Sequence, residues 1–354
     1  MFPHYRQINP ENFRRIRLHE GFFMRQDTSS RKTFIKEIKT IFIFFPVIVM
    51  LLVSCRSFSP AQLNLSGSLE KGKIQKSKFE DFIPDWQPFA REQGMGLFYT
   101  AAKTSDPKLE FWAIKADLTE PSLKVIVNGQ TDRGEFKSTR VSSFVRDNNL
   151  LAGINAVPFD PVSAKEGIAI SCAGIVISNS ILLAPPVPQY DAIVFYKAEN
   201  PSNRRSAILS QNEIGDYNTI ENAAGGFRIV LEDGVLPERL LPKTTSGGKP
   251  QPSAAGSRHP RSSVGLSADG NILYFLVIDG RRSGSIGATE SELGSILGKL
   301  GAAWGLNLDG GGSSALALRF PDGKVRTINN PVHGGIRGRE RAVAACVGIQ
   351  FGYL

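Results

Sequence analysis

Short apolar runs alternate with polar turn residues from Leu97 to the end of the chain. Runs of this length, rich in Val, Ile, Phe and Leu, are typical of β-strands. We expect strands at Leu97–Thr100, Glu110–Ala116, Leu123–Val127, Gly153–Asn155, Cys172–Ile177, Ala192–Tyr196, Phe227–Leu231, Val264–Leu266, Leu273–Ile278, Gly305–Leu308 and Val343–Ile349. Gly, Asp and Asn between the runs favour tight turns. The pattern predicts a core built mainly of β-sheet.

Two segments repeat their apolar residues at helical spacing instead. Thr289 and Glu292 form a capping box, and Gly301 is placed to end the helix that follows them. Residues 138–148 predict a second, shorter helix with its apolar side chains on one face. Together with the strands, these helices predict an α+β fold over residues 91–354, a single mixed domain with a sheet-dominated core and a few flanking helices.

The first 54 residues are typical of an export signal. An apolar run from Ile41 to Val53 follows a basic stretch, and Pro46 interrupts it, so the run is too short to span a bilayer, which takes about 20 apolar residues. The run ends before Cys55 in a motif that resembles a bacterial lipobox, in which the cysteine is lipidated. We expect an exported protein anchored by lipid in the bacterial envelope, with residues 55–90 as a tether and Met24 as the translation start. An ordinary cleaved signal is the alternative.

Charge and cysteine content limit the kinds of molecule that the chain is expected to bind. Residues 1–54 hold nine Lys or Arg and four Asp or Glu, so they contribute +5 of the net charge of +9 and leave +4 for the rest. That charge is too mild for a nucleic-acid groove, and no zinc-type cysteine spacing is present. Cys172 and Cys346 lie in apolar, strand-like runs. We interpret them as buried free thiols, with a disulfide as the alternative, and the oligomeric state is left open.

A run of three glycines predicts a binding turn at the end of a strand. Asn307 and Asp309 alternate with leucines, so both polar side chains project from the same face of the strand. Glycines 310–312 let a ligand approach the main chain, and Ser313 adds a hydroxyl and a free N–H. This arrangement favours a site for a sugar or a phosphate. By itself the segment is also consistent with a tight hairpin.

A second stretch places further charged residues at strand ends. His259-Pro-Arg261 begins one strand, a turn at 268–271 leads back into another, and that strand ends in Asp279-Gly-Arg281. Simpler interpretations remain, because Asp before Gly often only forms a turn and His before Pro can only cap a strand. Arg341 next to Glu340 can likewise be a surface pair of little energetic weight.

In this order, the motifs resemble those of the phosphodiester glycosidase family. The matching segments, spread over residues 95–354, are Gly153-Ile-Asn155 with Phe159-Asp160, Ala224-Gly-Gly-Phe227, His259-Pro-Arg261, Asp279-Gly-Arg281, Asn307-Leu-Asp-Gly-Gly-Gly-Ser313, Asn330-Pro331 and Glu340-Arg-Ala-Val343. The chain departs from the family pattern at Ala156-Val-Pro158 and at Ser262, where members commonly have Thr. These departures affect the expected substrate preference rather than the expected fold.

The resemblance implies hydrolysis of a sugar-1-phosphodiester of the N-acetylglucosamine type. A phosphate leaving group needs little protonation, so cations and a carboxylate at the sugar matter most. We expect Asp309 to act as nucleophile or base, with Asp279 and His259 as further catalytic candidates. The expected substrate-binding residues are Asn155, Arg261, Arg281, Asn307, Gly310, Gly311, Gly312, Ser313 and Arg341. Asn155 and Asn307 would hold sugar hydroxyls or orient a carboxylate. Arg can hold phosphate with two parallel hydrogen bonds.

No cofactor follows from the motifs. Asp and Asn oxygens could hold calcium, but neither an EF-hand-like nor a His-rich spacing is present, so we predict neither a metal site nor an obligatory transition metal. Two rival functions remain open. One is a non-catalytic envelope lipoprotein that binds cell-wall glycan or exopolysaccharide, and the other is a hydrolase of teichoic-type or lipid-linked sugar phosphates.

Overall fold

The computed structural model describes residues 75–89, 96–128, 136–197, 205–241, 243–244, 250–251 and 256–352. All of them belong to one compact unit, Pro60–Leu354. The expected signal segment, Cys55 and residues 55–74 of the expected tether lie outside the described residues and stay predictions. Within the described part of the chain, no helix is both long enough and apolar enough to cross a membrane.

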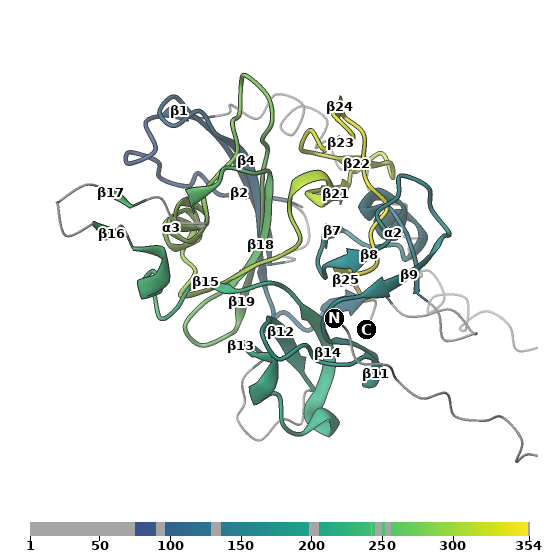
Figure 1. The fold of residues 1–354 in the computed structure, drawn as a ribbon. Coiled ribbons are helices and arrows are strands. Elements are labelled where there is room, and N and C mark those ends of the chain that lie inside the picture. Colours follow the sequence, from purple (N-terminus) through teal and green to yellow (C-terminus); the bar gives the residue numbers. More distant parts are fainter. Residues whose placement is uncertain are drawn as a thin grey trace, which may run out of the picture. The chain divides into compact units, whose positions relative to one another are not determined.

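The largest sheet has eight strands and carries the segments with the charged motifs (Figure 1). Its order is β1 (Gln75–Ser77), β3 (Leu97–Thr104), β4 (Glu110–Asp117), β19 (Ile272–Ile278), β18 (Arg261–Leu266), β20 (Trp304–Asn307) and β15 (Ile229–Leu231), and β2 (Gln87–Pro88) pairs with β3. The expected hairpin is confirmed, since β18 and β19 pair antiparallel from Arg261 opposite Ile278 to Leu266 opposite Leu273. β20 lies on the other side of β18, with Asn307 opposite Ser263.

Two five-stranded sheets complete the core. The first has the order β22 (Val325–Thr327), β21 (Leu316–Arg319), β7 (Ala152–Asn155), β25 (Cys346–Phe351) and β5 (Leu123–Val127). The second has the order β11 (Ile181–Ala184), β10 (Val176–Ser178), β14 (Ile220–Gly225), β12 (Asp191–Tyr196) and β13 (Ser206–Ser210).

Smaller ladders and single turns of helix surround these sheets. The ladders are β6 (Phe136–Lys137), β9 (Ala169–Cys172) and β8 (Phe159–Asp160) in one, β16 (Lys243–Thr244) with β17 (Pro250–Gln251), and β23 (Val332–His333) with β24 (Ile336–Arg337). The 3-10 turns are η1 (Gln211–Glu213), η2 (Tyr217–Thr219), η3 (Glu238–Leu240) and η5 (Gly311–Ser313).

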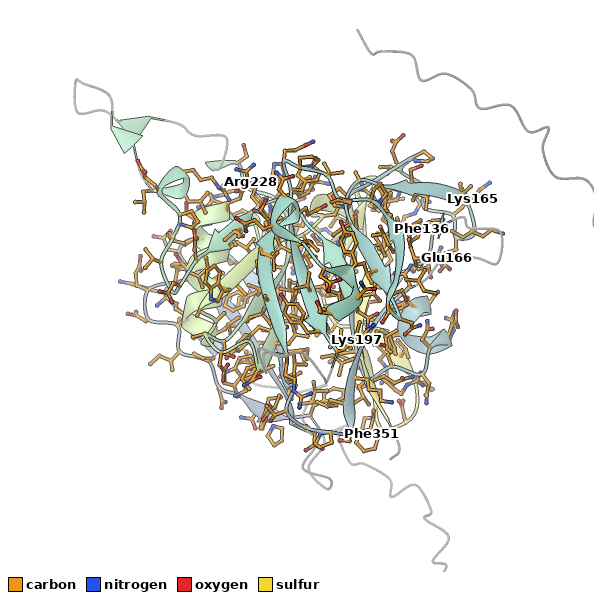
Figure 2. All side chains as sticks on the ribbon, turned by 90° about the horizontal axis from the view of Figure 1, so that it is seen from below. Phe136, Lys165, Glu166, Lys197, Arg228 and Phe351 are labelled. Carbon is orange, nitrogen blue, oxygen red and sulfur yellow. The ribbon has the colours of Figure 1, made fainter. Side chains whose placement is uncertain are left out.

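Apolar side chains from all three large sheets form the main core. Ile154 of β7, Ile193 of β12 and Phe275 of β19 belong to the same buried cluster, as do Leu306 and Leu308. Figure 2 shows how densely side chains fill the space between the strands. The expectation that Leu306 and Leu308 point to the core is therefore confirmed, and the chain beyond them is anchored by this packing.

Both expected helices are present. α3 (Glu290–Leu300) starts at the capping box of Thr289 and Glu292 and ends at Gly301, which has a φ of 104°. Its apolar face covers the eight-stranded sheet, where Leu293 and Leu297 share a core with Leu231 and Leu276. α2 (Val141–Asp147) packs against β7 and β21 of the first five-stranded sheet (Figure 1). These are the two α-helices of the described residues, so the mixed class is mostly β.

Several expected strands differ in extent from the observed ones, and the difference is largest at Cys172–Ile177. The run Cys172–Ile177 divides into β9 and β10, which belong to different sheets. The break lies at Gly174, whose φ of 148° is unusual for an L-residue. Cys172 and Cys346 are both free thiols, as interpreted from the sequence. Burial raises the pKa of Cys172 to about 12.

Candidate functional site

The triple-glycine turn follows directly from β20, which lies between β18 and the edge strand β15 of the largest sheet. After β20 the backbone N–H of Asp309 donates to the carbonyl of Ala156 at 2.9 Å, and that of Gly311 donates to the carbonyl of Pro260 at 2.8 Å. The turn is thus bound to two other segments, one after β7 and one before β18. η5 then returns the chain to the core through the buried Ser313 and Ser314. Rigid support on both sides fixes where the Asp309 carboxylate lies.

Asp309 is a partly exposed carboxylate with a perturbed proton affinity. Burial raises its pKa to about 6, although the Ser313 hydroxyl, the Arg341 guanidinium and the Gly310 backbone N–H favour the charged form. Desolvation therefore outweighs three stabilising interactions. A carboxylate of this kind is mostly ionised near pH 7 and can still take up a proton, which suits a base or a nucleophile.

Two guanidinium groups lie against the glycines of the turn. A Cβ on Gly311 would be 3.0 Å from Nη2 of Arg281, and a Cβ on Gly312 would be 2.5 Å from Nη2 of Arg341. Arg281 has a φ of 60°, a left-handed conformation that is uncommon outside glycine. Residues without side chains are needed here because both cations occupy the space where side chains would stand.

The two cations are close enough to affect each other. Arg281 lowers the pKa of Arg341, although burial is the larger cause and Asp309 acts in the opposite direction. Among the described residues, neither guanidinium forms an ion pair with a carboxylate. Two cations beside one carboxylate leave the turn with excess positive charge. An anion would relieve this charge.

Arg341 does not pair with the neighbouring Glu340. Its Nε donates to Nδ1 of His333 at 3.0 Å, and its Nη1 donates to the Ser313 hydroxyl at 3.2 Å. Glu340 instead accepts hydrogen bonds from Thr327, at 2.6 Å, and from the Ser142 hydroxyl. Arg341 is therefore held toward the turn through Ser313, which is also bonded to Asp309.

Two histidines border this cation pair. His259 is exposed, and its pKa is lowered by burial and by the charges of Arg261 and Arg281. The pKa of His333 is lowered by burial and by Arg341 and Arg339. Both imidazoles are therefore mostly neutral at pH 7, and a neutral imidazole can donate one hydrogen bond to an anion without adding charge.

Asn155 lies behind the site. Its side chain is fully buried, and its Nδ2 donates to the backbone carbonyl of Asp309 at 2.6 Å. Its Oδ1 accepts from the Ser262 hydroxyl at 2.7 Å and from the backbone N–H of Ala315 at 3.1 Å. All of these contacts are internal, so this geometry fits the positioning of Asp309 better than contact with substrate.

Asp279 and Arg261 are likewise turned inward. Asp279 is 1% exposed and accepts from Arg282, from Nδ2 of Asn329 at 3.0 Å and from the backbone N–H of Asn330 at 3.0 Å. Burial raises its pKa. Arg261 donates to the carbonyls of Ala288, at 3.1 Å, and Ser257, at 3.0 Å. Of the expected residues, the structure thus brings together Asp309, Arg281, Arg341, Ser313, His259 and the three glycines, and it places Asn155, Asp279 and Arg261 in their support.

Asn307 lies at the base of the turn with an unsatisfied side chain. Its Oδ1 is buried and has no hydrogen-bond partner among the described residues. Its backbone is fully used, since its N–H donates to the carbonyl of Arg228 at 3.0 Å and its carbonyl accepts from the N–H of Phe227 at 2.8 Å. Buried polar atoms without partners are uncommon, and a bound hydroxyl or water would satisfy this one.

Sequence reasoning missed His333 and Asn329. His333 precedes two glycines in a short hairpin, and Asn329 stands beside the Asn330-Pro331 motif. Asn329 also donates to the carbonyl of Ser314 at 3.0 Å and accepts from the N–H of Leu316 at 3.0 Å. The sequence signal was a polar cluster just before the Glu340-Arg341 motif. Among the described residues, no group of three or more His, Cys, Asp or Glu side chains could hold a metal ion.

Solved structures of low sequence identity have a similar fold. The catalytic domain of zebrafish N-acetylglucosamine-1-phosphodiester alpha-N-acetylglucosaminidase, auto-inhibited by its pro-peptide, is 16% identical, with a TM-score of 0.53 over 76% of this chain and 88% of that one. A putative exported protein from Burkholderia pseudomallei is 13% identical, with a TM-score of 0.51 over 69% of this chain and 74% of that one.

A hypothetical protein from Synechocystis is 16% identical, with a TM-score of 0.49, and the match covers 72% of this chain but only 62% of that protein. No curated protein matches this chain in sequence. The model of the phosphodiester glycosidase family matches residues 148–350, which include Asn155, His259, Asp309 and Arg341. With this match over more than half of its length, the chain belongs to the phosphodiester glycosidase family.

Proposed function

We propose that this protein hydrolyses a sugar-1-phosphodiester of the N-acetylglucosamine type in envelope glycan or glycolipid metabolism. The observation that carries the proposal is the turn at Asp309, where a carboxylate of raised pKa lies near the Arg341 guanidinium and Arg281 lies beside the same glycines. In the described part of the chain, neither guanidinium forms an ion pair with a carboxylate. A sugar-1-phosphodiester offers an electrophilic carbon next to an anionic phosphate, so its two charged parts match the two parts of the site.

In this proposal Arg281 and Arg341 bind the phosphate oxygens. Arg281 is exposed and reaches over Gly311, and Arg341 is oriented by His333 and Ser313. The cations stabilise the negative charge that the phosphate gains as the bond to the sugar carbon breaks. Neutral His259 donates a further hydrogen bond. A phosphate leaves as a weak base, so no strong general acid is needed.

Asp309 acts on the sugar side. In its ionised form it takes a proton from the attacking water or attacks the anomeric carbon itself, and both steps require the charged carboxylate. Asn155 fixes the Asp309 backbone. The unsatisfied Oδ1 of Asn307 is suited to accept a hydrogen bond from a sugar hydroxyl. We assign Asp279 to the support of the Asp279–Arg282 turn, because its oxygens are already bonded within the protein.

The type of sugar and the cellular setting rest on different observations. N-acetylglucosamine is proposed because the zebrafish structure of similar fold is an N-acetylglucosamine-1-phosphodiester glycosidase. Export and a lipid anchor at Cys55 are proposed from the basic and apolar segments before it. Residues of the tether would then let the folded unit reach substrates at a distance from the membrane.

Sugar release from a panel of sugar-1-phosphodiesters tests the proposal. The full chain should release N-acetylglucosamine from its α-phosphodiester, and Asp309→Asn should reduce kcat by 10³-fold or more, as expected for loss of a base or nucleophile. Asp322→Asn, at an exposed turn, is the matched control and should be silent. Binding of the phosphodiester without release by the native chain would instead favour a non-catalytic glycan-binding lipoprotein.

A further inference from the structure

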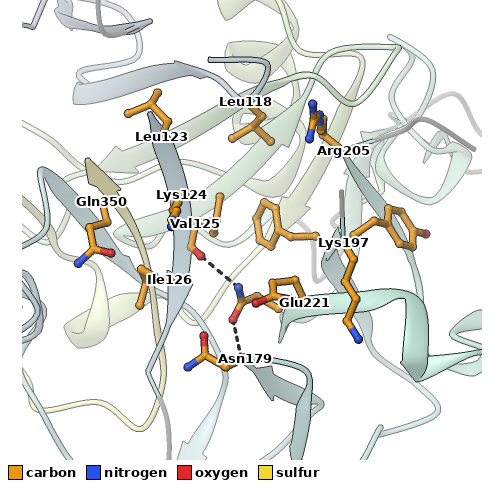
Figure 3. Close-up of a pocket in the computed structure, with 13 residues that line it drawn as sticks. Leu118, Leu123, Lys124, Val125, Ile126, Asn179, Lys197, Arg205, Glu221 and Gln350 are labelled. Carbon is orange, nitrogen blue, oxygen red and sulfur yellow. Dashed lines mark hydrogen bonds between the residues drawn. The ribbon is translucent and has the colours of Figure 1, made fainter. Parts of the chain in front are cut away.

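A cavity lies away from the triple-glycine turn, between the five-stranded sheet that contains β5 and the five-stranded sheet that contains β12 and β14. It has a volume of about 610 Å³ and is lined by residues of β5, β12 and β14 and of the loops beside them (Figure 3). This volume is within the range of about 300–1,000 Å³ that is usual for small-molecule sites. The cavity is therefore large enough for a short oligosaccharide.

Strand register places this cavity at the far end of β25 from the catalytic turn. Asn155, which holds Asp309, pairs with Cys346 at one end of β25, and Lys124 pairs with Gln350 nearer its other end. Four residues of strand separate these two levels, which corresponds to about 13 Å. The cavity is lined by residues other than those of the Asp309 turn, so it is a separate site.

The lining of the cavity carries an excess of cations. Lys124, Lys197 and Arg205 contribute three positive charges, and Glu221 contributes one negative charge. Among the described residues these three cations form no ion pair. Glu221 is already bonded to the Ser180 hydroxyl at 3.1 Å. Figure 3 shows the cations spread along the cavity rather than gathered at one point, which fits an extended ligand with several negative charges.

Neutral donors stand between the cations. In an antiparallel strand the N–H and C=O of one residue point to the same side. The carbonyl of Val125 faces away from β25, since it accepts from Nδ2 of Asn222 at 3.1 Å, so the Val125 N–H also faces the cavity side. The side chain of Asn179 lines the cavity as well (Figure 3). Such donors suit the many oxygen atoms of a sugar chain.

A peptide strand is a poor fit for the same place. β5 is the edge of its sheet, and an added strand would need its free carbonyls. The carbonyl of Val125 is already occupied by Asn222, and the carbonyl of Val127 accepts from the Ser178 hydroxyl at 2.7 Å. Side chains of the neighbouring sheet thus block pairing along this edge.

We propose that this cavity, lined by Lys124, Lys197 and Arg205, binds a short acidic oligosaccharide. The site holds a negatively charged stretch of glycan remote from Asp309. The proposal adds to the proposed function, because a glycosidase that acts on envelope glycan would gain residence on its polymer from a second binding site.

Binding to the full chain tests the proposal by calorimetry, with tri-galacturonate and a glycerol-phosphate trimer as anionic probes, maltotriose as neutral probe and a tri-glutamate peptide as rival. We expect tri-galacturonate to bind, and K124Q/K197Q/R205Q to weaken this binding at least 10-fold. The charge-matched triple K78Q/K165Q/K324Q, at exposed lysines elsewhere, should leave it unchanged. Figure 2 shows Lys165 well apart from Lys197.

The outcomes separate this proposal from the catalytic one. Asp309→Asn should keep full binding at the cavity while losing turnover, and K124Q/K197Q/R205Q should keep turnover of a small sugar-1-phosphodiester. Equal weakening by both triples would show general charge attraction and overturn the site. So would preferential binding of tri-glutamate or of the glycerol-phosphate trimer, or no binding of tri-galacturonate. A charge-reversing Lys197→Glu with an unchanged melting temperature should also abolish binding, which guards against loss by misfolding.

Discussion

Asp309 shows how a single residue is kept reactive at a cost to the fold. Its carboxylate accepts hydrogen bonds from Ser313 and Gly310 and lies near Arg341, and each of these favours the charged form. Burial nevertheless raises its pKa to about 6. The charged form is thus less stable in the folded protein than in the unfolded chain. Residues that are kept in such a state are typical of functional sites.

The first prediction follows from the sign of this shift. The folded pKa of about 6 lies above the ordinary value of 3.8, so the folded state holds the proton more tightly. The contribution of the Asp309 carboxyl to the free energy of unfolding is therefore greatest below about pH 4 and is lost as pH rises through 6. Asp309→Asn removes the ionisation and should raise the free energy of unfolding at pH 7.5 by up to about 3 kcal/mol.

Denaturant unfolding of both proteins at pH 7.5 and at pH 4 measures this effect. The advantage of the Asn variant should shrink to near zero at pH 4. Asp322→Asn is the control, because the pKa of Asp322 is lowered, chiefly by the backbone N–H of Lys324, and its effect should not follow this direction. An equal advantage at both pH values, or a loss at pH 7.5, would show that Asp309 is not penalised by burial.

At the scale of the element, much of the fold could be predicted from the sequence. The capping box of Thr289 and Glu292, the α2 segment and the β18–β19 hairpin depend on local spacing, and all three are present. Apolar residues flank Gly174 on both sides, so the local pattern predicts a single strand at Cys172–Ile177. The run divides because β9 and β10 pair with strands of two different sheets. Local spacing in the sequence does not show which strands will pair.

The second prediction concerns the turn element. A Cβ on Gly312 would meet the Arg341 guanidinium at 2.5–3.1 Å, and a guanidinium can move because it ends a flexible side chain. Gly312→Ala should therefore change the free energy of unfolding by less than about 1 kcal/mol. The displaced cation should raise KM or lower kcat/KM by at least 10-fold for a sugar-1-phosphodiester.

Gly215→Ala is the matched control, since a Cβ there has no atom within 4 Å. Kinetics and thermal denaturation of both variants separate a shifted cation from a damaged fold. A Gly312→Ala enzyme with native kcat/KM would mean that the position of Arg341 does not matter for catalysis. A large loss of stability would mean that the turn cannot accommodate the methyl group.

At the scale of the whole molecule, the site forms where segments from two large sheets meet. Asp309 follows β20 of the eight-stranded sheet, and Asn155 ends β7 of a five-stranded sheet. The sequence indicates that both residues matter, but it leaves open whether Asn155 holds a sugar hydroxyl or orients a carboxylate. Separating a supporting residue from a contacting one requires the position of every neighbour. The same limit applies to Asp279 and Arg261. Asp279 accepts a hydrogen bond from Asn329, which is distant in the chain, and Arg261 donates to the main-chain carbonyl of Ala288.

The last prediction tests Asn155 as the connection between these sheets. Asn155→Asp keeps the size of the side chain but replaces the amide donor that bonds the Asp309 carbonyl at 2.6 Å, and it adds a charge at a site with no exposed area. Burial and the facing Asp309 carbonyl both disfavour a charged carboxylate at position 155, so they raise its pKa. The variant is therefore most destabilised at high pH, where this carboxyl must ionise. We expect the free energy of unfolding to fall by about 3 kcal/mol or more at pH 8 and by less at pH 5, as measured by denaturant unfolding.

Asn148→Asp is the control, because the amide of Asn148 also donates to a carbonyl, that of Phe144 at 2.9 Å, but its side chain is exposed. Similar losses for the two variants, or a loss at Asn155 that does not grow with pH, would remove Asn155 from its role in joining the sheets and supporting Asp309.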